Sequence, residues 1–546
     1  MSERLITMRD LEIEGFQEEQ WKKIVHGVDV HLDRGEVIGL IGESGAGKST
    51  IGMAAMGYTR PGCRITGGSI VFDGMDLTKA SAEEKRKLRG VRISYVAQSA
   101  AASFNPAHRL ISQYAEAPVH HGVLTASEAE RNAREIYRRL DLPDPDHIGE
   151  RYPHQVSGGQ LQRCMVAMAL ACKPDLIVFD EPTTALDVTT QIEVLAAIKD
   201  VIRQFNTAAI YITHDLAVVA QVADRIMVLQ YGNTVEVGEA RELLANPKEE
   251  YTRRLLSVRK VAEDKAGQLD RDKVILKADD VSAAYSNGVQ VLFDIDLKLT
   301  RSKTMAVVGE SGSGKSTLAR VITGLLPPSK GKLEFDGSEL PAAFRNRNKD
   351  LLRRLQMIYQ MPDVALNPRQ KVRDVIGRPL EFYFGLSGDQ KQVRVRELLE
   401  MIELSDRYAD RYPAELSGGE KQRVCIARAL AAEPELIICD EVTSALDQLV
   451  AEGILKLLQD LQNELHVSYL FITHDLATVK AVSDEIVVML QGRVVEFGPR
   501  EEILSPPHHE YTELLLASVP EMDPDWLDGV LERRDSGELM DSVSIN

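Results

Sequence analysis

The chain has 546 residues, and 65 lysine and arginine residues against 83 aspartate and glutamate residues give it a formal net charge of −18. This length is sufficient for several compact domains, and 44% hydrophobic with 27% charged residues is an ordinary globular composition that excludes disordered and collagen-like proteins. The acidic balance, without a stripe rich in lysine and arginine, argues against a protein that works on nucleic acid, because phosphate neutralisation dominates that affinity.

Cysteine usage and hydropathy predict a cytoplasmic protein. The five cysteines include no C-x-x-C pair, so we expect neither a zinc ribbon nor a disulfide framework. Residues 1–15 lack the apolar core of a signal peptide. No apolar run reaches the roughly 18 residues that a membrane-spanning helix needs. If the protein works at a membrane, it must dock on the helices of other proteins.

The sequence is a tandem duplication. Residues 157–187 and 417–447 align at an offset of 260 and are identical at 18 of 31 positions. A period this long indicates two domains rather than a solenoid. A polar, highly charged stretch between them predicts an exposed linker, and the acidic end of the chain predicts a solvated, partly ordered tail. The predicted segments are a first domain at 1–257, a linker at 258–273, a second domain at 274–519 and a tail at 520–546.

Short apolar runs alternate with helical stretches in each copy. Runs of four to six residues rich in valine and isoleucine are typical of buried parallel strands in an α/β sheet. Residues 126–140 and 390–404 have helical periodicity and charged faces, and they predict a small helical lobe inserted in each copy. The predicted strands are 37–41, 176–179 and 209–212 in the first copy, and 305–308, 436–439 and 469–472 in the second.

A phosphate-binding loop follows the first of these strands in each copy. GESGAGKS and GESGSGKS both fit G-x-x-x-x-G-K-[ST] between a predicted strand and a predicted helix. The glycines let backbone N–H groups curl around phosphate oxygens at a helix N-terminus, the lysine neutralises the β and γ phosphates, and the serine is a ligand of Mg²⁺. The predicted nucleotide-binding residues of the loops are Gly42, Ser44, Gly45, Gly47, Lys48, Ser49 and Thr50, and Gly309, Ser311, Gly312, Gly314, Lys315, Ser316 and Thr317.

The next two strands end in chemically active side chains. One ends in an aspartate that suits Mg²⁺, usually through water, and the adjacent glutamate is predicted to orient and deprotonate the attacking water. The other ends in a histidine 33 residues beyond the glutamate, which is predicted to contact the γ-phosphate and to couple to the base. These residues are Asp180, Glu181 and His214 in the first copy, and Asp440, Glu441 and His474 in the second.

A serine followed by two glycines stands 24 residues before each glutamate, in VSGGQ and LSGGE. Here the sequence resembles the ATP-binding-cassette (ABC) family, whose LSGGQ signature each pentapeptide matches with one change. The resemblance covers nearly the whole chain except the linker and the tail. It implies an α/β fold of two tandem P-loop NTPase cassettes, each with a parallel or mixed sheet core and an inserted helical subdomain. It makes Gln98 and Gln360 the Q-loop glutamines, which contact ATP and Mg²⁺, and residues 185–187 and 445–447 the D-loops.

The signature completes a nucleotide site only between two cassettes. In this family it caps the γ-phosphate held by the opposite cassette, so that ATP joins the two in a head-to-tail sandwich. Because both copies keep the aspartate, the glutamate and the histidine, we expect two hydrolytic sites. The phosphate loop of the first copy is expected to meet Ser417, Gly418 and Gly419, and that of the second copy Ser157, Gly158 and Gly159. Departures that we expect to tune rates are Val156 and Glu420 in the signatures and Val442 in the place of a proline.

An aromatic side chain is expected to stack on the adenine. The family position matches Tyr285 in the second copy. In the first copy Phe16 is the candidate, although it lies about one residue out of register and Trp21 competes with it.

Two further features resemble the importer ATPases for dipeptides, oligopeptides, glutathione, opines and nickel, in particular subunits that fuse both cassettes. Asn-Pro follows each Q-loop glutamine, and both copies end in proline, Tyr-Thr and a leucine pair, at 247–256 and 507–515. The resemblance implies an ATP hydrolase on the cytoplasmic face of the inner cell membrane that energises import of a small, peptide-like solute. It also implies two transmembrane permease subunits docking near the Q-loops, beside Phe104 and Ala365, and an extracytoplasmic solute-binding protein.

The alternative function is a soluble twin-cassette ABC ATPase of translation or DNA repair. Its members carry a long charged helical linker or zinc-binding cysteine sets, and the sequence shows neither. We expect ATP and Mg²⁺ as cofactors and no nucleic acid as partner. No cysteine follows Cys439, so we expect no iron-sulfur cluster, and we expect no zinc. His508 and His509 have Lys248 and Glu249 in the corresponding stretch of the first copy, which favours a role without metal.

Overall fold

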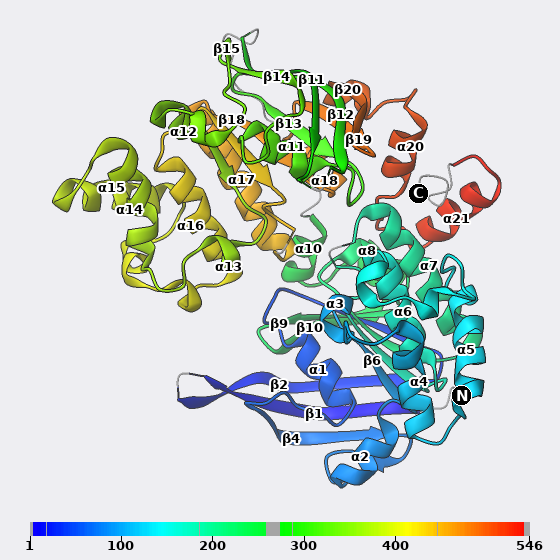
Figure 1. Ribbon diagram of the computed structural model, residues 1–546. Coiled ribbons are helices and arrows are strands. Elements are labelled where there is room, and N and C mark those ends of the chain that lie inside the picture. Colours follow the sequence, from blue (N-terminus) through cyan, green and yellow to red (C-terminus); the bar gives the residue numbers. More distant parts are fainter. Residues whose placement is uncertain are drawn as a thin grey trace. The chain divides into compact units, whose positions relative to one another are not determined.

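A computed structural model of the chain describes residues 4–17, 19–184, 186–257, 273–286, 288–444 and 446–539. The described residues form two compact units. Unit 1 is the described part of Met1–Val258 together with Pro520–Glu538, and unit 2 is the described part of Arg259–Val519 and Leu539–Asn546 (Figure 1). Apart from Lys273, the predicted linker lies outside the described residues, as do Ala185 and Ala445 of the predicted D-loops and positions 540–546 of the predicted tail.

Unit 1 contains two sheets. An antiparallel sheet has the strand order β2-β1-β4-β5, and a mixed sheet has the order β10-β9-β3-β8-β7-β6, in which β10 alone runs antiparallel to its neighbour. The strands are β1 (Arg4–Gln17), β2 (Gln20–Asp33), β3 (Val37–Ile41), β4 (Cys63–Phe72), β5 (Met75–Asp76), β6 (Ile93–Val96), β7 (Leu176–Asp180), β8 (Ala208–Ile212), β9 (Arg225–Gln230) and β10 (Asn233–Glu239).

Unit 2 repeats this topology. Its antiparallel sheet has the order β12-β11-β14-β15, and its mixed sheet the order β16-β17-β18-β13-β19-β20. The strands are β11 (Val274–Ala284), β12 (Gln290–Thr300), β13 (Thr304–Val308), β14 (Lys330–Phe335), β15 (Ser338–Glu339), β16 (Leu355–Ile358), β17 (Leu436–Asp440), β18 (Ser468–Ile472), β19 (Glu485–Leu490) and β20 (Arg493–Pro499).

Helices cover these sheets and form a lobe in each unit. Within the described ranges, no helix combines the length and the apolar character needed to cross a bilayer. Unit 1 has α1 (Lys48–Ala55), α2 (Ala82–Leu88), α3 (Ala100–Ser103), α4 (Leu110–His120), α5 (Ala126–Arg139), α6 (Gly158–Leu170), α7 (Val188–Phe205), α8 (Leu216–Ala220), α9 (Ala240–Ala245), α10 (Glu250–Ser257) and α21 (Trp526–Asp535). Unit 2 has α11 (Lys315–Ile322), α12 (Lys349–Arg354), α13 (Pro362–Ala365), α14 (Val372–Phe384), α15 (Gly388–Met401), α16 (Gly418–Leu430), α17 (Gln448–Leu465), α18 (Leu476–Val482), α19 (Arg500–Ile503) and α20 (Glu510–Ala517).

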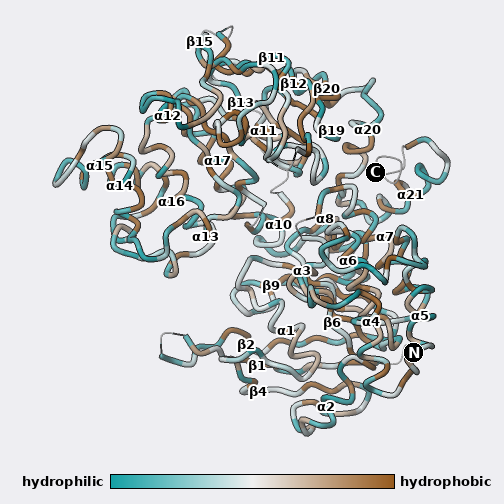
Figure 2. Tube along the Cα trace, in the orientation of Figure 1, coloured by the Kyte–Doolittle hydropathy of each residue, from teal (hydrophilic) through white to brown (hydrophobic). Residues whose placement is uncertain are grey.

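The six predicted strands agree with the structure to within one residue at each end. All five residues of β3, β7 and β8 are buried, as they are in β13, β17 and β18, because parallel strands at the centre of a sheet are covered on both faces. Figure 2 shows the hydrophobic residues of each unit concentrated in its interior, whereas α2 and α5 are largely hydrophilic. The predicted lobe helices correspond to α5 and α15.

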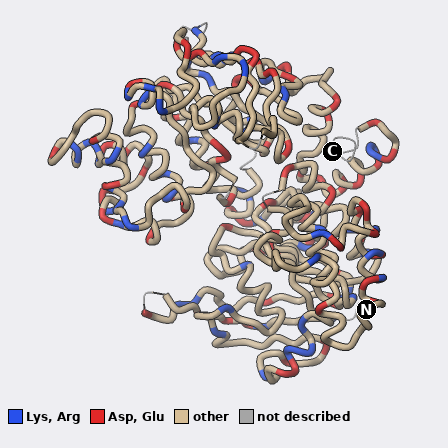
Figure 3. The backbone as a smooth tube through the Cα atoms, viewed as in Figure 1, with Lys and Arg blue, Asp and Glu red and all other residues tan. Residues whose placement is uncertain are grey.

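A four-membered ion cluster joins the two sheets of each unit. In unit 1 Arg34 contacts Asp73 at 3.0 Å and Asp175 at 2.7 Å, and Arg92 contacts the same carboxylates at 2.6 and 2.7 Å. Asp73 follows β4 in the antiparallel sheet, and Asp175 precedes β7 in the mixed sheet. In unit 2 the equivalent cluster consists of Arg301, Asp336, Arg354 and Glu435. Figure 3 shows the two signs of charge interspersed over both units on the face drawn.

The C-terminal segment Pro520–Glu538, called here the C-terminal arm, packs on unit 1. The side-chain amide of Gln221, at the end of α8, donates to the carbonyl oxygens of Glu521 at 2.7 Å and Asp523 at 3.0 Å, and it accepts from the N–H of Leu527 at 3.0 Å. Leu527 and Val530 are buried. The expectation of a solvated, partly ordered tail did not include this attachment, in which two apolar side chains of the arm are buried and its backbone bonds to Gln221, while most of its other residues are exposed or half-buried.

Charged side chains add to the attachment of the arm. Lys199 of α7 contacts Asp528 at 2.7 Å, and Arg241 of α9 makes a bidentate contact with Asp525. The equivalent positions of the second copy, 260 residues on, hold Gln459, Ala481 and Glu501 in place of Lys199, Gln221 and Arg241. The three side chains that bind the arm on unit 1 are therefore not repeated at the equivalent positions of unit 2.

Candidate functional site

Each unit forms a phosphate loop between a buried strand and a helix. The first loop joins β3 to α1, which begins at Lys48, and the second joins β13 to α11. The Lys48 ammonium donates to the carbonyl oxygens of Gly42 at 2.6 Å and Glu43 at 2.9 Å. Lys315 repeats both bonds in the second loop, at 2.7 Å each. In both units, backbone carbonyl oxygens of the loop thus hold the lysine ammonium in place.

The loop serine meets the aspartate that ends the neighbouring strand. Ser49 Oγ donates to Asp180 Oδ1 at 2.8 Å, and Ser316 Oγ donates to Asp440 Oδ1 at 3.0 Å. In unit 1 the Tyr95 hydroxyl also donates to Asp180 Oδ2 at 2.5 Å. Sequence reasoning missed Tyr95, whose only signal is a polar aromatic residue inside a strand, three residues before the Q-loop glutamine. The second copy has a methionine at the equivalent position, and burial raises the pKa of Asp440 despite the bond from Ser316.

The two glutamates have an unusual backbone conformation. Glu181 and Glu441 both have φ of 50°, in the left-handed region that non-glycine residues rarely adopt. Their N–H groups donate to the carbonyl oxygens of Ile212 and Ile472, at 2.8 and 2.9 Å, at the end of the neighbouring strand. The sheet edge therefore imposes this conformation. Strain of this kind is common where a side chain must point into a site.

Each glutamate is held between a glutamine and a histidine. Gln98 Nε2 donates to Glu181 Oε2 at 2.9 Å, and His214 Nδ1 lies 3.3 Å from Glu181 Oε1. In unit 2 the corresponding distances are 2.5 Å from Gln360 and 3.4 Å from His474. The structure thus brings together, within each unit, the predicted lysine, serine, aspartate, glutamine, glutamate and histidine.

Burial and charge oppose each other in the glutamate and histidine pairs. Burial acts to raise the pKa of Glu181, but the hydrogen bond with His214 and the nearby charge of Lys48 bring it below the ordinary value. Burial acts to lower the pKa of His214, but Glu181 brings it above the ordinary value. Glu441 and His474 shift in the same directions for the same reasons. Each pair is therefore an ionised carboxylate beside a histidine that holds a proton more readily than usual.

The signature serines begin helices α6 and α16. Ser157 Oγ accepts from the N–H of Gln160 at 3.3 Å while the Gln160 side chain accepts from the N–H of Ser157 at 3.1 Å, which is a capping box. Ser417 and Glu420 make the same pair of bonds at 3.3 and 2.7 Å, so the glutamate in LSGGE preserves the cap. The capped end leaves helix N–H groups available at an N-terminus that favours an anion.

The second signature glycine has no room for a side chain. A Cβ at Gly159 would lie 2.1 Å from Thr190 Cγ2, and a Cβ at Gly419 would lie 2.4 Å from Val450 Cγ1. Both neighbours belong to the helix that follows the D-loop, α7 or α17. Close packing of the two helix ends thus requires glycine here. The pairing of each signature with the phosphate loop of the other unit stays a prediction.

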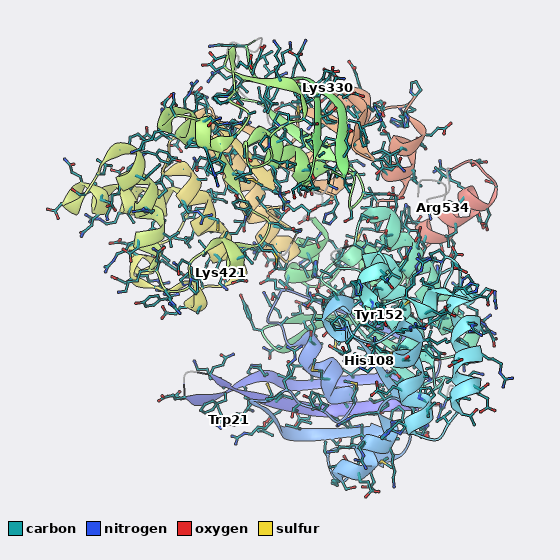
Figure 4. The ribbon with its side chains drawn as sticks, in the orientation of Figure 1. Trp21, His108, Tyr152, Lys330, Lys421 and Arg534 are labelled. Atoms are coloured by element: carbon teal, nitrogen blue, oxygen red, sulfur yellow. The ribbon has the colours of Figure 1, made fainter. Side chains whose placement is uncertain are left out.

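The adenine candidates differ between the units. The Tyr285 hydroxyl lies 3.1 Å from Thr317 Oγ1 of α11, which places its ring beside the second phosphate loop. Phe16 lies in the β1–β2 hairpin, and its ring contacts that of Trp21 with centroids 5.3 Å apart and ring planes inclined by 58°. Figure 4 labels Trp21 in this hairpin. Both aromatics of that hairpin are exposed, so the geometry leaves Phe16 and Trp21 as alternatives.

The segment after the second Q-loop glutamine is fastened to the signature helix. Arg428 of α16 donates to the carbonyl oxygen of Ala365 at 2.6 Å, and Lys421 contacts Asp363 at 2.7 Å (Figure 4). Both acceptors belong to α13. The first copy has methionine and leucine at the positions equivalent to the arginine and the lysine. This link was not predicted. The sequence signal for it is that the second copy has two basic residues where the first copy has two uncharged ones.

The paired histidines at the end of unit 2 have structural partners. His509 caps α20, where its Nδ1 accepts from the N–H of Tyr511 at 3.2 Å. The largely buried His508 ring lies 3.7 Å from Glu513. In the portion of the chain that the structure covers, no group of three or more histidine, cysteine, aspartate or glutamate side chains is arranged for a metal ion.

Comparison with known families gives two matches. Residues 25–184 and 292–444 match the family described as ABC transporter. Residues 495–541 match the family described as oligopeptide/dipeptide transporter, C-terminal region, and this range includes the whole C-terminal arm.

Individual relatives align along nearly their whole length. The peptidoglycan transport ATP-binding protein YejF of Agrobacterium fabrum is 37% identical over 527 residues, covering 94% of this chain and 96% of the relative. The glutathione import ATP-binding protein GsiA of Salmonella choleraesuis is 36% identical over 565 residues, covering 96% and 90%. GsiA of Escherichia coli O6:H1 is 35% identical over 565 residues, covering 95% and 90%.

Proposed function

Because the chain belongs to the ABC transporter family, we propose that its two cassettes close on two composite sites that each hydrolyse ATP and together drive import of a peptide-like solute. The chain is an ATP-hydrolysing importer subunit of the fused double-cassette type, and its relatives are named for glutathione and peptidoglycan transport. The observation that carries two active sites is the repeat, in both units, of the lysine, serine–aspartate and glutamine–glutamate–histidine contacts.

The residues present fit Mg²⁺ in each site. Magnesium prefers oxygen ligands and keeps water and phosphate oxygens in its coordination shell. Ser49 with Asp180, and Ser316 with Asp440, place a hydroxyl and a carboxylate oxygen together beside the phosphate loop. The side-chain carbonyls of Gln98 and Gln360 are further candidate ligands. When bound, the ion neutralises charge on the β and γ phosphates.

Each of these side chains has its own role in the proposed hydrolysis. Lys48 exchanges its loop carbonyls for the β and γ phosphate oxygens as ATP binds. Glu181, ionised and held between Gln98 and His214, orients the attacking water and accepts its proton. His214 stays bonded to the glutamate and contacts the γ-phosphate. The signature serine and glycines of the other unit complete the anion site with helix N–H groups. Unit 2 works in the same way through Lys315, Glu441 and His474.

The chain works with membrane permease partners, as importer ATPases do. We propose that two transmembrane subunits dock near the Q-loops and that the chain lies on the cytoplasmic face of the cell membrane, with an extracytoplasmic solute-binding protein in the assembled system. Support comes from the second Q-loop, where Met361 and Val364 are 58% and 80% exposed. Apolar side chains so exposed, on a segment fastened to the signature helix, suit a protein contact.

Replacing one glutamate at a time tests the two-site proposal. Glu181→Gln and Glu441→Gln keep the size of the side chain but remove the base, so each change should slow hydrolysis at its own site by about 10² to 10⁴. Single-turnover hydrolysis and solute uptake are measured with the assembled transporter. Glu464→Gln, at an exposed position on α17, is the matched control and should leave both rates unchanged.

The two variants also have an outcome that contradicts the proposal. If Glu441→Gln leaves ATPase and transport unchanged while Glu181→Gln abolishes both, the second site is degenerate. Val442 makes the second site the slower candidate, because it stands where the first copy has Pro182.

A further inference from the structure

The tyrosine of each C-terminal Tyr-Thr pair reaches the phosphate loop of its own unit. The N–H of Glu310, the second residue of the loop, donates to the hydroxyl of Tyr511 at 2.8 Å across 201 residues of sequence. The N–H of Glu43 donates to the hydroxyl of Tyr251 at 3.3 Å. The Tyr511 side chain is fully buried. A motif that the sequence offered only as a mark of one family branch therefore contacts the nucleotide-binding loop in both units.

The tyrosine and the loop lysine form hydrogen bonds with the same peptide group. The amide between Gly309 and Glu310 donates its N–H to Tyr511, and its carbonyl oxygen accepts from Lys315 at 2.7 Å. Because a peptide group is planar, bonds at both of its ends fix its orientation. The glycine adds a constraint: its φ is +146°, and a Cβ there would lie 2.2 Å from the carbonyl oxygen of Met489. The first turn of the loop thus has a single supported orientation.

The helix that carries the tyrosine is itself anchored next to the loop. Glu496 of β20 accepts from the N–H of His509 at 3.3 Å, and His509 caps α20. Leu514 and Leu515, one turn further on, are buried. In unit 1 Glu236 accepts from the N–H groups of the two residues that precede α10, at 2.9 and 3.2 Å. These contacts hold the hydroxyl in place independently of the loop.

We propose that Tyr511, and Tyr251 in unit 1, are positioning residues that keep the phosphate loop ordered for ATP. The inference rests on the proposed function. When ATP binds, the lysine leaves the loop carbonyls for the phosphates, and the tyrosine hydroxyl then remains as the bond that holds the Gly–Glu peptide. Without it, ATP must order the loop on binding, and that cost appears as lost affinity. Tyr251 makes the longer bond, so its contribution is the smaller of the two.

Tyr511→Phe is tested in the full chain carrying Lys48→Ala, so that the second loop gives the binding signal. Equilibrium binding of ATP is measured by calorimetry in EDTA, which prevents hydrolysis. We expect the dissociation constant to rise about three- to tenfold, the range of one neutral hydrogen bond. The matched control is Tyr469→Phe in the same unit: this tyrosine is buried, its hydroxyl has no hydrogen-bond partner among the residues that the structure describes, and removal of the hydroxyl should leave affinity unchanged.

Kinetics and stability separate positioning from a merely structural role. In the otherwise unchanged chain, Tyr511→Phe should raise KM for ATP while kcat at saturating ATP stays within about twofold, because the bond acts on binding and not on the chemical step. The unfolding midpoint should fall no more than in Tyr114→Phe, which also removes the hydrogen bond of a buried tyrosine hydroxyl, here to Asn132 and outside the phosphate loop. Affinity equal to that of Tyr469→Phe overturns the proposal, and so does an equal loss of affinity in Tyr114→Phe. If the Lys48→Ala parent binds no ATP at all, the proposed function itself fails.

Discussion

Replacing Leu527 by alanine tests whether the C-terminal arm is bound to unit 1 through its apolar seat. The Leu527 side chain is fully buried, and truncating such a leucine costs about 2–5 kcal/mol. The three hydrogen bonds of Gln221 to the arm contribute about 1 kcal/mol each, and the exposed ion pair of Arg241 with Asp525 contributes less. The change therefore removes a large part of the docking free energy, and the arm should detach by local unfolding before the rest of unit 1 opens.

Hydrogen exchange of the full chain, followed by mass spectrometry, measures this detachment. Amides of α21 should exchange at least about 30-fold faster in Leu527→Ala, the factor that corresponds to 2 kcal/mol. The sheet of unit 1 should keep its protection. Glu532→Ala lies on the same helix at an exposed position, so it controls for changes in helix propensity. It should change the free energy of opening that the exchange rates report by less than about 0.5 kcal/mol.

One result would refute the reasoning. If Leu527→Ala and Glu532→Ala leave α21 with the same exchange rate, the burial of Leu527 contributes nothing to docking. The arm would then depend on its charged contacts alone, and its exchange would respond to salt instead.

Two further predictions concern unit 2. Arg428→Met introduces the residue that the first copy has at the equivalent position, and it removes the hydrogen bond to the Ala365 carbonyl. We expect the permease-stimulated ATPase rate to fall several-fold while the affinity for ATP stays unchanged. The control is Arg396→Met, at an exposed position of α15, which should change neither quantity. Asp336 has a pKa lowered to about 2 by Lys273 and, against burial, by Arg354 and Arg301. Since the folded pKa lies below the unfolded value, this carboxylate stabilises the fold above about pH 4, and the benefit is lost between about pH 4 and 2. The unfolding midpoints of wild type and Asp336→Asn should therefore converge over that interval; a constant difference would contradict the assignment.

Local sequence patterns predicted the parts of the fold and site that local physics determines. The buried strands were predicted correctly because a short run of four or five apolar residues, rich in valine and isoleucine and bounded by turn signals, is typical of a buried strand. The phosphate loop, aspartate, glutamate and histidine followed from their spacing, and the structure places each set together. The antiparallel sheets were missed because β1 and β4 interleave polar and apolar residues irregularly, with two register shifts in their pairing.

Contacts between distant segments could not be predicted in this way. The arm is hydrophilic and has no strong pattern, and its seat depends on Lys199, Gln221 and Arg241, about 300 residues earlier. A weak signal was present: Gln221 interrupts an apolar run, and the second copy has alanine at that position. The tyrosine bonds to the phosphate loops are equally long-range. The left-handed conformation of the two glutamates had no sequence signal, because glutamate does not mark such positions as glycine does.

The left-handed conformation of the two glutamates affects activity and stability differently. Holding Glu181 and Glu441 at φ of 50° costs about 1–2 kcal/mol that glycine would not incur. A mutation from glutamate to glycine relieves that strain, but it also removes the contacts of the side chain with its glutamine and histidine partners, so the two effects on stability oppose each other. Folding alone therefore does not account for a glutamate at these positions. If both sites hydrolyse ATP as proposed, each copy bears the backbone strain because the reaction needs a carboxylate there.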